Sequence, residues 1–386
     1  MRQFITQCID DVKIFQYKQD LKDKNPHSLS NCFYHYYLPF QSSLKLRNYF
    51  IRYDKVAIRF GRLMELFDLI AGEVSYKFIE YQNDKATIVT ACVDHIQFIE
   101  NIDPKKDVHI QVYPSYIGKS TVEVQIDAYQ PRDIYGQDPN DLENLELDLK
   151  TTAYFLMVAR DSNDRSRAFQ LPEYKPDSEI AIQLQAQGNI RQEERKNKSK
   201  NSLSKQSPRQ EQIDLIHKFF TNFQKYDKDP EYQPISETAI SKIQPMHFQD
   251  QNIHGNIFGG YIFREAFELG QLCALMFQDP TKYGRAKLKY IDDFQFYEPV
   301  LIGDILKFEA QLCYVKDKLG FVQVDCYRMK NNKTILSKTN ALHLIFELPI
   351  NQGRVFPVSY GDAIRYISGS NFVENYQKRQ ISQDGY

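Results

Sequence analysis

The feature that most constrains the fold of this chain is an internal repeat. A helix-like segment followed by several strand-like segments occurs twice, and corresponding positions lie about 200 residues apart. Gly61 and Gly260 open the two helical segments, and Asp94 and Asp292 occupy matching positions in the strands that follow. Because this spacing is nearly constant, we interpret the chain as a tandem duplication of one folding unit.

Each copy has the residue pattern of a buried helix beside an antiparallel sheet. Apolar residues recur every three or four positions, which places them on one helical face. They are Leu63, Phe67, Ile70, Val74 and Phe78 in the first copy, and Ile262, Ala266, Leu269, Cys273 and Met276 in the second. Thr, Val and Ile alternate with polar residues, as in half-buried antiparallel strands, over 86–92, 93–99, 107–113, 120–129 and 145–160. We therefore expect an α+β fold in which each copy wraps a long antiparallel sheet around a central helix.

A chain of 386 residues is expected to form more than one domain. Residues 187–210 are polar and low in complexity, which indicates a flexible or partly helical linker, and Ser207 with Pro208 is expected to start a helix through 213–220. The aromatic segment 33–40 either packs on the first copy or docks another chain, and we favour packing. The predicted organisation is an N-terminal extension (1–45), a first domain (46–180), a charged linker and helix (181–225), a second domain (226–366) and a C-terminal tail (367–386).

The composition argues against several functional classes. The net charge is −1, which gives no indication of a nucleic-acid partner or an anionic membrane surface. The six cysteines include no CxxC pair, and no group of His, Asp and Glu has metal-ligand spacing, so we expect neither disulfides nor a metal. No apolar run reaches the length of a membrane span. The first 24 residues mix four lysines with four aspartates, which is not typical of a transit peptide.

Several motifs resemble those of one family. They are FGGYIFREAFELG (258–270), ARDS (159–162) before Phe169, IDD (291–293) before Phe296, and RVFP (354–357) before Tyr360 and Gly361. In this order and spacing they resemble the tandem hot-dog acyl-coenzyme A thioesterases, in particular the mitochondrial acyl-CoA thioesterase 9 group.

The resemblance covers most of the chain and has several implications. It implies two hot-dog domains packed as an internal pseudo-dimer, and a homo-oligomer, commonly of three such chains. The implied activity is hydrolysis of fatty acyl-CoA to free fatty acid and CoA, without a cofactor. The implied location is mitochondrial, with the cytoplasm as the alternative.

The two copies differ where a hot-dog active site is expected. With the helices aligned, Asp68 of the first copy falls opposite Phe267 of the second, and the polar turn at residues 254–256 falls opposite residues 55–57. A hot-dog site takes its turn from one domain and its acid from the other. We therefore expect one composite site, with Asp68 facing residues 254–256, and a second site that lacks both parts.

The candidate catalytic residues follow from this pairing. Asp68 is the general base toward a water molecule or, alternatively, the nucleophile that forms an anhydride. Asn256 orients the water or the carbonyl, and the backbone N–H groups at Gly259-Gly260 stabilise the oxyanion. His254 either donates to the carbonyl or only holds its turn, and we favour the structural role. Gly255 completes the acyl-CoA-binding turn.

The phosphates of CoA need cationic partners. Lys119, in a turn between two strands, and Arg160 are the candidates. Weaker candidates are Arg62, Arg264 and Lys289. We expect Glu65, one helical turn before Asp68, to be solvated.

A second class of function stays open. The chain would then be a catalytically silent hot-dog protein, serving as a structural subunit of a larger mitochondrial assembly such as a respiratory-chain complex. Residues 33–40, the linker and the tail 367–386 would be its docking surfaces. Retention of Asp68 together with the polar turn favours the enzyme. A dehydratase on this fold would need a histidine beside the helix, and residues 60–80 and 258–280 contain none.

Overall fold

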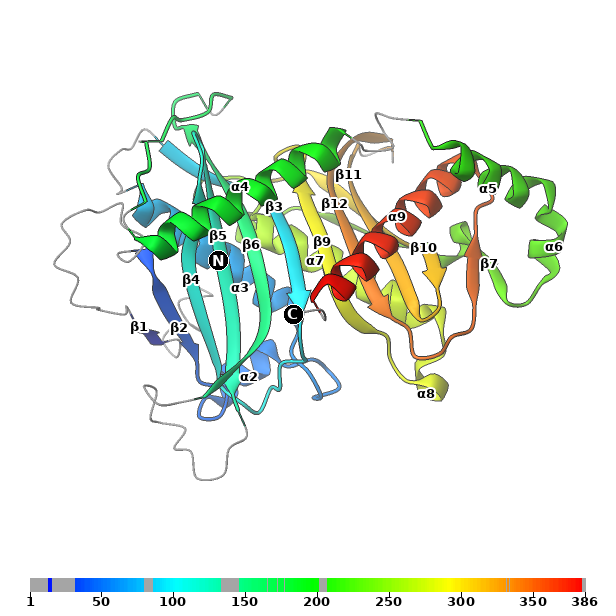
Figure 1. Cartoon of the computed structure of the whole chain (residues 1–386), viewed down its shortest axis with the longest axis horizontal. Coiled ribbons are helices and arrows are strands. Elements are labelled where there is room, and N and C mark those ends of the chain that lie inside the picture. The colour runs from blue at the N-terminus through cyan, green and yellow to red at the C-terminus, as the bar shows by residue number, and fades with distance from the viewer. Residues whose placement is uncertain are drawn as a thin grey trace. The chain divides into compact units, whose positions relative to one another are not determined.

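The computed structural model describes residues 13–15, 32–79, 86–132, 146–164, 166–171, 173–176, 178–200, 207–330, 332 and 334–383. The chain forms two compact units (Figure 1). Unit 1 contains residues 1–191 and 247–264, and unit 2 contains residues 192–246 and 265–386. A segment from the second half of the sequence, 247–264, therefore belongs to the unit built mainly by the first half.

Unit 1 is an antiparallel sheet with one long helix, α3 (Phe60–Phe78), that contacts four of its strands. The strand order is β1-β2-β4-β5-β6-β3. The strands are β1 (Lys13–Phe15), β2 (Tyr34–Leu38), β3 (Ala86–Phe98), β4 (Val108–Ile117), β5 (Thr121–Pro131) and β6 (Leu147–Asp161). A short helix, α2 (Leu44–Phe50), precedes α3, and α4 (Glu179–Lys200) follows the sheet.

Unit 2 has an antiparallel sheet in the order β9-β12-β11-β10-β8. Its strands are β8 (Ile240–Pro245), β9 (Lys287–Phe296), β10 (Ile305–Lys316), β11 (Leu319–Met329) and β12 (Ile335–Glu347). Helix α7 (Gly259–Phe277) packs on β11 and β12 through Gly270, and α9 (Tyr360–Gln383) packs on β10 and β11. The remaining elements are α5 (Gln210–Thr221), α6 (Phe223–Lys228), β7 (Tyr232–Pro234), η2 (Ile235–Thr238), η3 (Phe248–Asp250), α8 (Pro280–Tyr283) and β13 (Arg354–Phe356).

The strands of the two units follow the same order. In unit 1 the strand after the long helix pairs with the last long strand, as in β3-β6-β5-β4-β2, and unit 2 repeats this as β9-β12-β11-β10-β8. The outer helices also repeat one packing detail. A Cβ on Gly188 of α4 would lie 2.3 Å from Tyr116 Cβ, and one on Gly369 of α9 would lie 2.6 Å from Tyr314 Cβ. Each unit thus uses a glycine to bring its outer helix against a tyrosine of its sheet.

The apolar face predicted for α3 is buried, with every predicted residue at most 3% exposed. The face predicted for α7 is correct except at Met276, whose side chain is 64% exposed. The aromatic segment 33–40 packs as predicted, because β2 lies in the sheet and Tyr34, Tyr36 and Phe40 are buried.

Several predicted boundaries differ from the structure. Residues 86–98 form one strand, not two, and shifts in its register against β6 produced the apparent break in alternation. Helix α5 begins at Gln210 with Arg209 as its N-cap, not at Ser207. The predicted boundaries after residues 180 and 366 fall inside α4 and α9, and residues 34–38 of the predicted extension are a strand of the sheet.

Two glycines in the interiors of α3 and α7 make a matched pair for stability measurements. A Cβ on Gly72 would meet only Met157 Cε, at 4.0 Å, whereas one on Gly270 would lie 2.4 Å from Leu344 Cδ1 and 2.9 Å from Val324 Cγ2. We expect Gly72→Ala to raise the free energy of unfolding by about 1 kcal/mol through helix propensity. We expect Gly270→Ala to lower it by about 1–3 kcal/mol through overpacking. Urea unfolding of both variants tests this, and a destabilising Gly72→Ala would contradict it.

Candidate active site

The carboxylate of Asp68 lies in the middle of α3, in unit 1. Its Oδ2 accepts the backbone N–H of Gly260 at 2.7 Å, and its Oδ1 accepts the Thr90 hydroxyl at 2.6 Å. The residue is 4% exposed. Gly260 lies in the first turn of α7, where backbone N–H groups lack intrahelical acceptors and the helix dipole favours a negative charge. The structure therefore brings together Asp68 and Gly260, two of the predicted site residues.

Burial raises the pKa of Asp68 to about 6. The hydrogen bonds from Thr90 and Gly260 oppose this rise, and the nearby Glu65 carboxylate adds to it. A carboxylate with this pKa is mostly ionised at pH 7 and remains a competent proton acceptor. Asp68 thus has the properties of a general base working near neutral pH.

Gly260 must be a glycine for this contact to form. A Cβ at this position would lie 2.7 Å from Cε1 of the Phe258 ring and 3.0 Å from the backbone Cα of Glu65. A side chain would therefore push the first turn of α7 away from α3. The paired glycines singled out in the sequence serve, at Gly260, the close approach of two helices.

Two further contacts join α3 to the same segment. Glu65 Oε2 is 3.1 Å from Arg264 Nε and accepts Arg62 Nη1 at 2.8 Å. Tyr76 OH is 2.8 Å from His254 Nε2. Glu65 is 6% exposed, so the expectation that it is solvated was wrong: the two arginines offset the cost of burying its charge. Arg62 and Arg264, weaker candidates for CoA, are the partners of this carboxylate.

The predicted polar turn is held together by Asn252, which sequence reasoning missed. Asn252 Oδ1 accepts the N–H groups of His254 at 2.9 Å and Asn256 at 3.2 Å, and Gly255 has a φ of +77°. An Asx residue followed by a glycine in the left-handed region is a recognisable turn signal. His254 and Asn256 are half-buried and Gly255 is exposed. The contacts of Asp68 run to Gly260, not to Asn256 as expected.

The corresponding turn of the first copy is also polar, which corrects the alignment. Asn252 N–H donates to Asn256 O at 2.7 Å, and Arg52 N–H donates to Ala57 O at 2.9 Å. Lys55 has a φ of 59°, so it, and not Val56, is the counterpart of Gly255. The earlier loop contains one extra residue and retains Asp54, bound to Arg52 through Nε at 2.9 and 3.0 Å. The two copies still differ at the helix position, where the second copy has Phe267 in place of Asp68. The Phe267 side chain is 1% exposed.

The structure does not bring the predicted CoA-binding cations to Asp68. Lys119 is exposed in the turn between β4 and β5. Arg160 pairs with Thr87, and by strand alternation it lies on the face of the sheet opposite Met157, which packs toward α3. Its Nη1 donates to Ser166 O at 3.3 Å, within the ARDS loop. Their roles as CoA contacts stay predictions.

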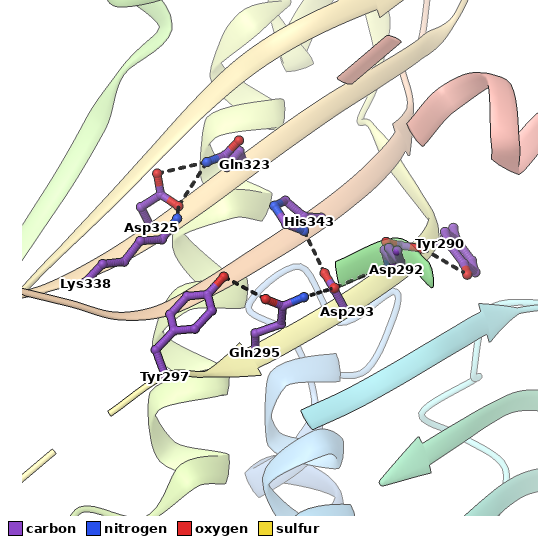
Figure 2. Close-up of polar contacts among 10 residues, drawn as sticks. Tyr290, Asp292, Asp293, Gln295, Tyr297, Gln323, Asp325, Lys338 and His343 are labelled. Carbon is purple, nitrogen blue, oxygen red and sulfur yellow. Dashed lines mark hydrogen bonds and ion pairs between the residues drawn. The ribbon is translucent and has the colours of Figure 1, made fainter. Parts of the chain in front are cut away.

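Unit 2 contains a separate buried polar cluster. His343 Nδ1 lies 2.6 Å from Asp293 Oδ1, and Gln295 also binds Asp293 (Figure 2). One ligand atom from each of Asp292, Asp293 and His343 lies within 4.8 Å of the others. Sequence spacing showed no such group, because β9 and β12 meet only in the folded sheet.

A lysine already supplies the positive charge of this cluster. The Lys198 amine binds Asp292 and lies 3.3 Å from Asp293 Oδ2. Burial acts to raise the pKa of Asp293, but Lys198 and His343 outweigh it and hold that pKa well below its usual range. The cluster is explained as a buried ion pair, and the prediction that the protein needs no metal remains a prediction.

Comparisons with known proteins find similarity to thioesterases. The thioesterase superfamily profile matches residues 60–135, which include α3, Asp68 and Thr90. Mitochondrial acyl-coenzyme A thioesterase 9 of Bos taurus is 28% identical over 364 residues, 91% of this chain and 79% of that protein. The Homo sapiens protein of that name is 27% identical, over 89% and 77%. A Bacteroides thetaiotaomicron acyl-ACP thioesterase structure is 10% identical, with a TM-score of 0.46, over 83% of this chain and all of that one.

The match to the thioesterase superfamily, together with the thioesterase relatives, supports a thioester hydrolase with a hot-dog domain. The chain is thus similar over most of its length to acyl-coenzyme A thioesterases, among them mitochondrial thioesterase 9.

The raised pKa of Asp68 predicts an unusual pH dependence of stability. Between the unfolded pKa of 3.8 and the folded pKa of about 6, the folded state binds more protons, so wild-type stability falls as pH rises through this window. We expect Asp68→Asn to raise the free energy of unfolding by about 3 kcal/mol at pH 8. This gain should disappear as the pH falls from 6 to 4.

The control is Asp161→Asn. Backbone N–H groups of Asn163 and Asp164 lower the pKa of Asp161, so this substitution should destabilise at both pH 4 and pH 8, and its effect should fade only as the pH falls below the unfolded pKa of 3.8. Urea unfolding of both variants at pH 4 and pH 8 measures the two effects. A pH-independent effect of Asp68→Asn would show that Asp68 titrates normally.

Proposed function

We propose that this chain hydrolyses acyl-CoA to a free acid and CoA at one site around Asp68. The observation that carries the proposal is the ionisable, buried Asp68 carboxylate held by Thr90 and by the first turn of α7. Helix α3, which carries Asp68, comes from the first half of the sequence, and Gly260 comes from the second half. We further infer that the two units are hot-dog domains of a duplicated chain, which their shared strand order supports.

The chemistry needs a base and an oxyanion site. Asp68 takes a proton from water as the water oxygen attacks the thioester carbonyl carbon. The tetrahedral intermediate then expels the CoA sulfur, which takes the proton back from Asp68. Because Gly260 N–H serves Asp68, the oxyanion donor we propose is Gly259 N–H, at the first position of α7. Direct attack by Asp68 to give an anhydride is the alternative route.

The position of Phe267 supports one site for each chain. Phe267 takes the place of the aspartate in α7 and is 1% exposed, so it offers neither a base nor a nucleophile. The complete set of Asp68, Thr90 and Gly260 also favours an enzyme over a structural subunit of a larger assembly. No helix among the described residues is long and apolar enough to cross a membrane. The names of the relatives support a mitochondrial location, and a homo-oligomer remains part of the proposal.

We expect Asp68→Asn to lower kcat about 10²–10⁴-fold, because one positioned base contributes this much. KM should change little, since the substitution is isosteric. Release of the CoA thiol from acyl-CoA of several chain lengths measures the rate.

The matched control is Asp127→Asn. Asp127 is also buried in unit 1 and also accepts a threonine hydroxyl, that of Thr152 at 2.6 Å, but it lies on β5. This variant should keep its kcat. An Asp68→Asn protein as active as wild type would refute the proposed site.

A further inference from the structure

Three contacts along α3 hold one stretch of chain in a fixed register. Glu65, Asp68 and Tyr76 follow one another along the helix, and they contact Arg264, Gly260 and His254, respectively. The segment 254–264 therefore runs along α3 in the opposite direction. The contact with Asp68 lies between the other two, so both outer contacts help to determine where Gly260 N–H lies.

The contact at Tyr76 is the more specific of the two outer contacts. Its oxygen accepts the N–H of Ile88 at 2.9 Å, which directs the hydroxyl hydrogen away from β3. His254 Nε2 lies 2.8 Å from the same oxygen. A neutral imidazole with its proton on Nδ1 accepts at Nε2. Tyr76 thus connects the strand that carries Thr90 with the turn that leads to Gly260.

The chain between His254 and Gly260 can transmit this restraint. Asn252 Oδ1 binds the N–H groups at both ends of the turn, and Phe258 N–H donates to Asp250 O at 2.8 Å. Ile257 forms a bridge with Gln251. Gly260 is also fitted tightly against the Glu65 backbone, with no room for a Cβ. Because these contacts allow little independent movement, a displacement at His254 also moves Gly260.

We propose that Tyr76 is a positioning residue of the active site, which keeps Gly260 N–H on Asp68 through its hydrogen bond to His254. The inference rests on the proposed function of Asp68. Neither Tyr76 nor Ile88 touches the reacting atoms in this scheme. In this scheme, Tyr76 controls how strongly Gly260 N–H is hydrogen-bonded to the base, Asp68.

This role has a measurable consequence, because the Gly260 hydrogen bond stabilises the ionised form of Asp68. The groups that face Asp68 are Glu65 on α3, Thr90 on β3 and Gly260 on α7. The cations Arg62 and Arg264 are bound to Glu65. A weaker Gly260 contact therefore raises the pKa of Asp68 and leaves the other groups in place.

The test is the pH profile of kcat/KM for Tyr76→Phe with acyl-CoA. We expect the acidic limb to move upward by about one pH unit, so that activity falls about fivefold at pH 6 and changes little at pH 8. His254→Leu should move the limb equally, and the double variant should move it no further than either single variant. In His254→Gln, the amide oxygen of the glutamine can accept the Tyr76 hydroxyl, so the acidic limb should stay where it is in the wild type.

The control is Tyr36→Phe. Tyr36 lies on β2, and its hydroxyl donates to Glu73 Oε2 of α3 at 3.2 Å. It is not one of the residues that contact the segment 254–264. It should lower the melting temperature without moving the acidic limb. A uniform loss of rate at all pH values in Tyr76→Phe, or an unchanged profile, would overturn the inference. If Asp68→Asn is inactive and Tyr76→Phe has a wild-type profile, only the inference fails; if Asp68→Asn is active, the proposed function fails first.

Discussion

The hydrogen bond between Gly260 N–H and the Asp68 carboxylate is the contact on which the organisation of unit 1 depends. It joins a helix from the first half of the sequence to a helix start from the second half. Together with the contacts of Glu65 and Tyr76, it accounts for the place of residues 247–264 in unit 1. A helix N-terminus offers both a free N–H and a favourable dipole to a negative charge. Glycine at position 260 is required because the backbone of Glu65 lies so close. Geometry and electrostatics therefore select the same residue.

This arrangement opposes stability, and under the proposed function it favours reactivity. Burying Asp68 makes its charged form less favourable in the folded state, and the hydrogen bonds from Thr90 and Gly260 compensate only in part. The resulting pKa lies where a base is most useful at neutral pH. Glu65, one turn earlier, shows the opposite solution, because two arginines accompany its buried charge. Helix α3 thus carries one buried carboxylate that is paired with arginines and one that is held by the neutral donors Thr90 and Gly260.

Sequence reasoning predicted the parts of this structure that depend on local periodicity. The buried face of α3 and the repeat of helix and strands follow from spacing along the chain. The pairing of Asp68 with the segment before α7 came from the hot-dog resemblance, which placed it at residues 254–256 rather than at Gly260. Thr90 and Tyr76 were missed, because their roles depend on the register of β3 against α3, which no periodicity specifies. The comparison of the two turns failed at Lys55 for a related reason. A single inserted residue shifts an alignment without changing the turn geometry, and a positive φ is visible only in the structure.

The same physical trade-off accounts for the difference between the two long helices. A carboxylate at position 267 would need donors comparable to Thr90 and Gly260, and without them its burial would cost several kcal/mol. Phe267 is instead 1% exposed, and burying a side chain of this size stabilises the fold by about 1.5–3 kcal/mol. Under the proposed function, α3 alone bears the cost of a buried base, because Phe267 occupies the equivalent position of α7. Phe267 in α7 and Asp68 in α3 occupy equivalent buried positions. A carboxylate is tolerated at position 68 because hydrogen-bond donors stabilise its charge, and an apolar side chain needs no such donors.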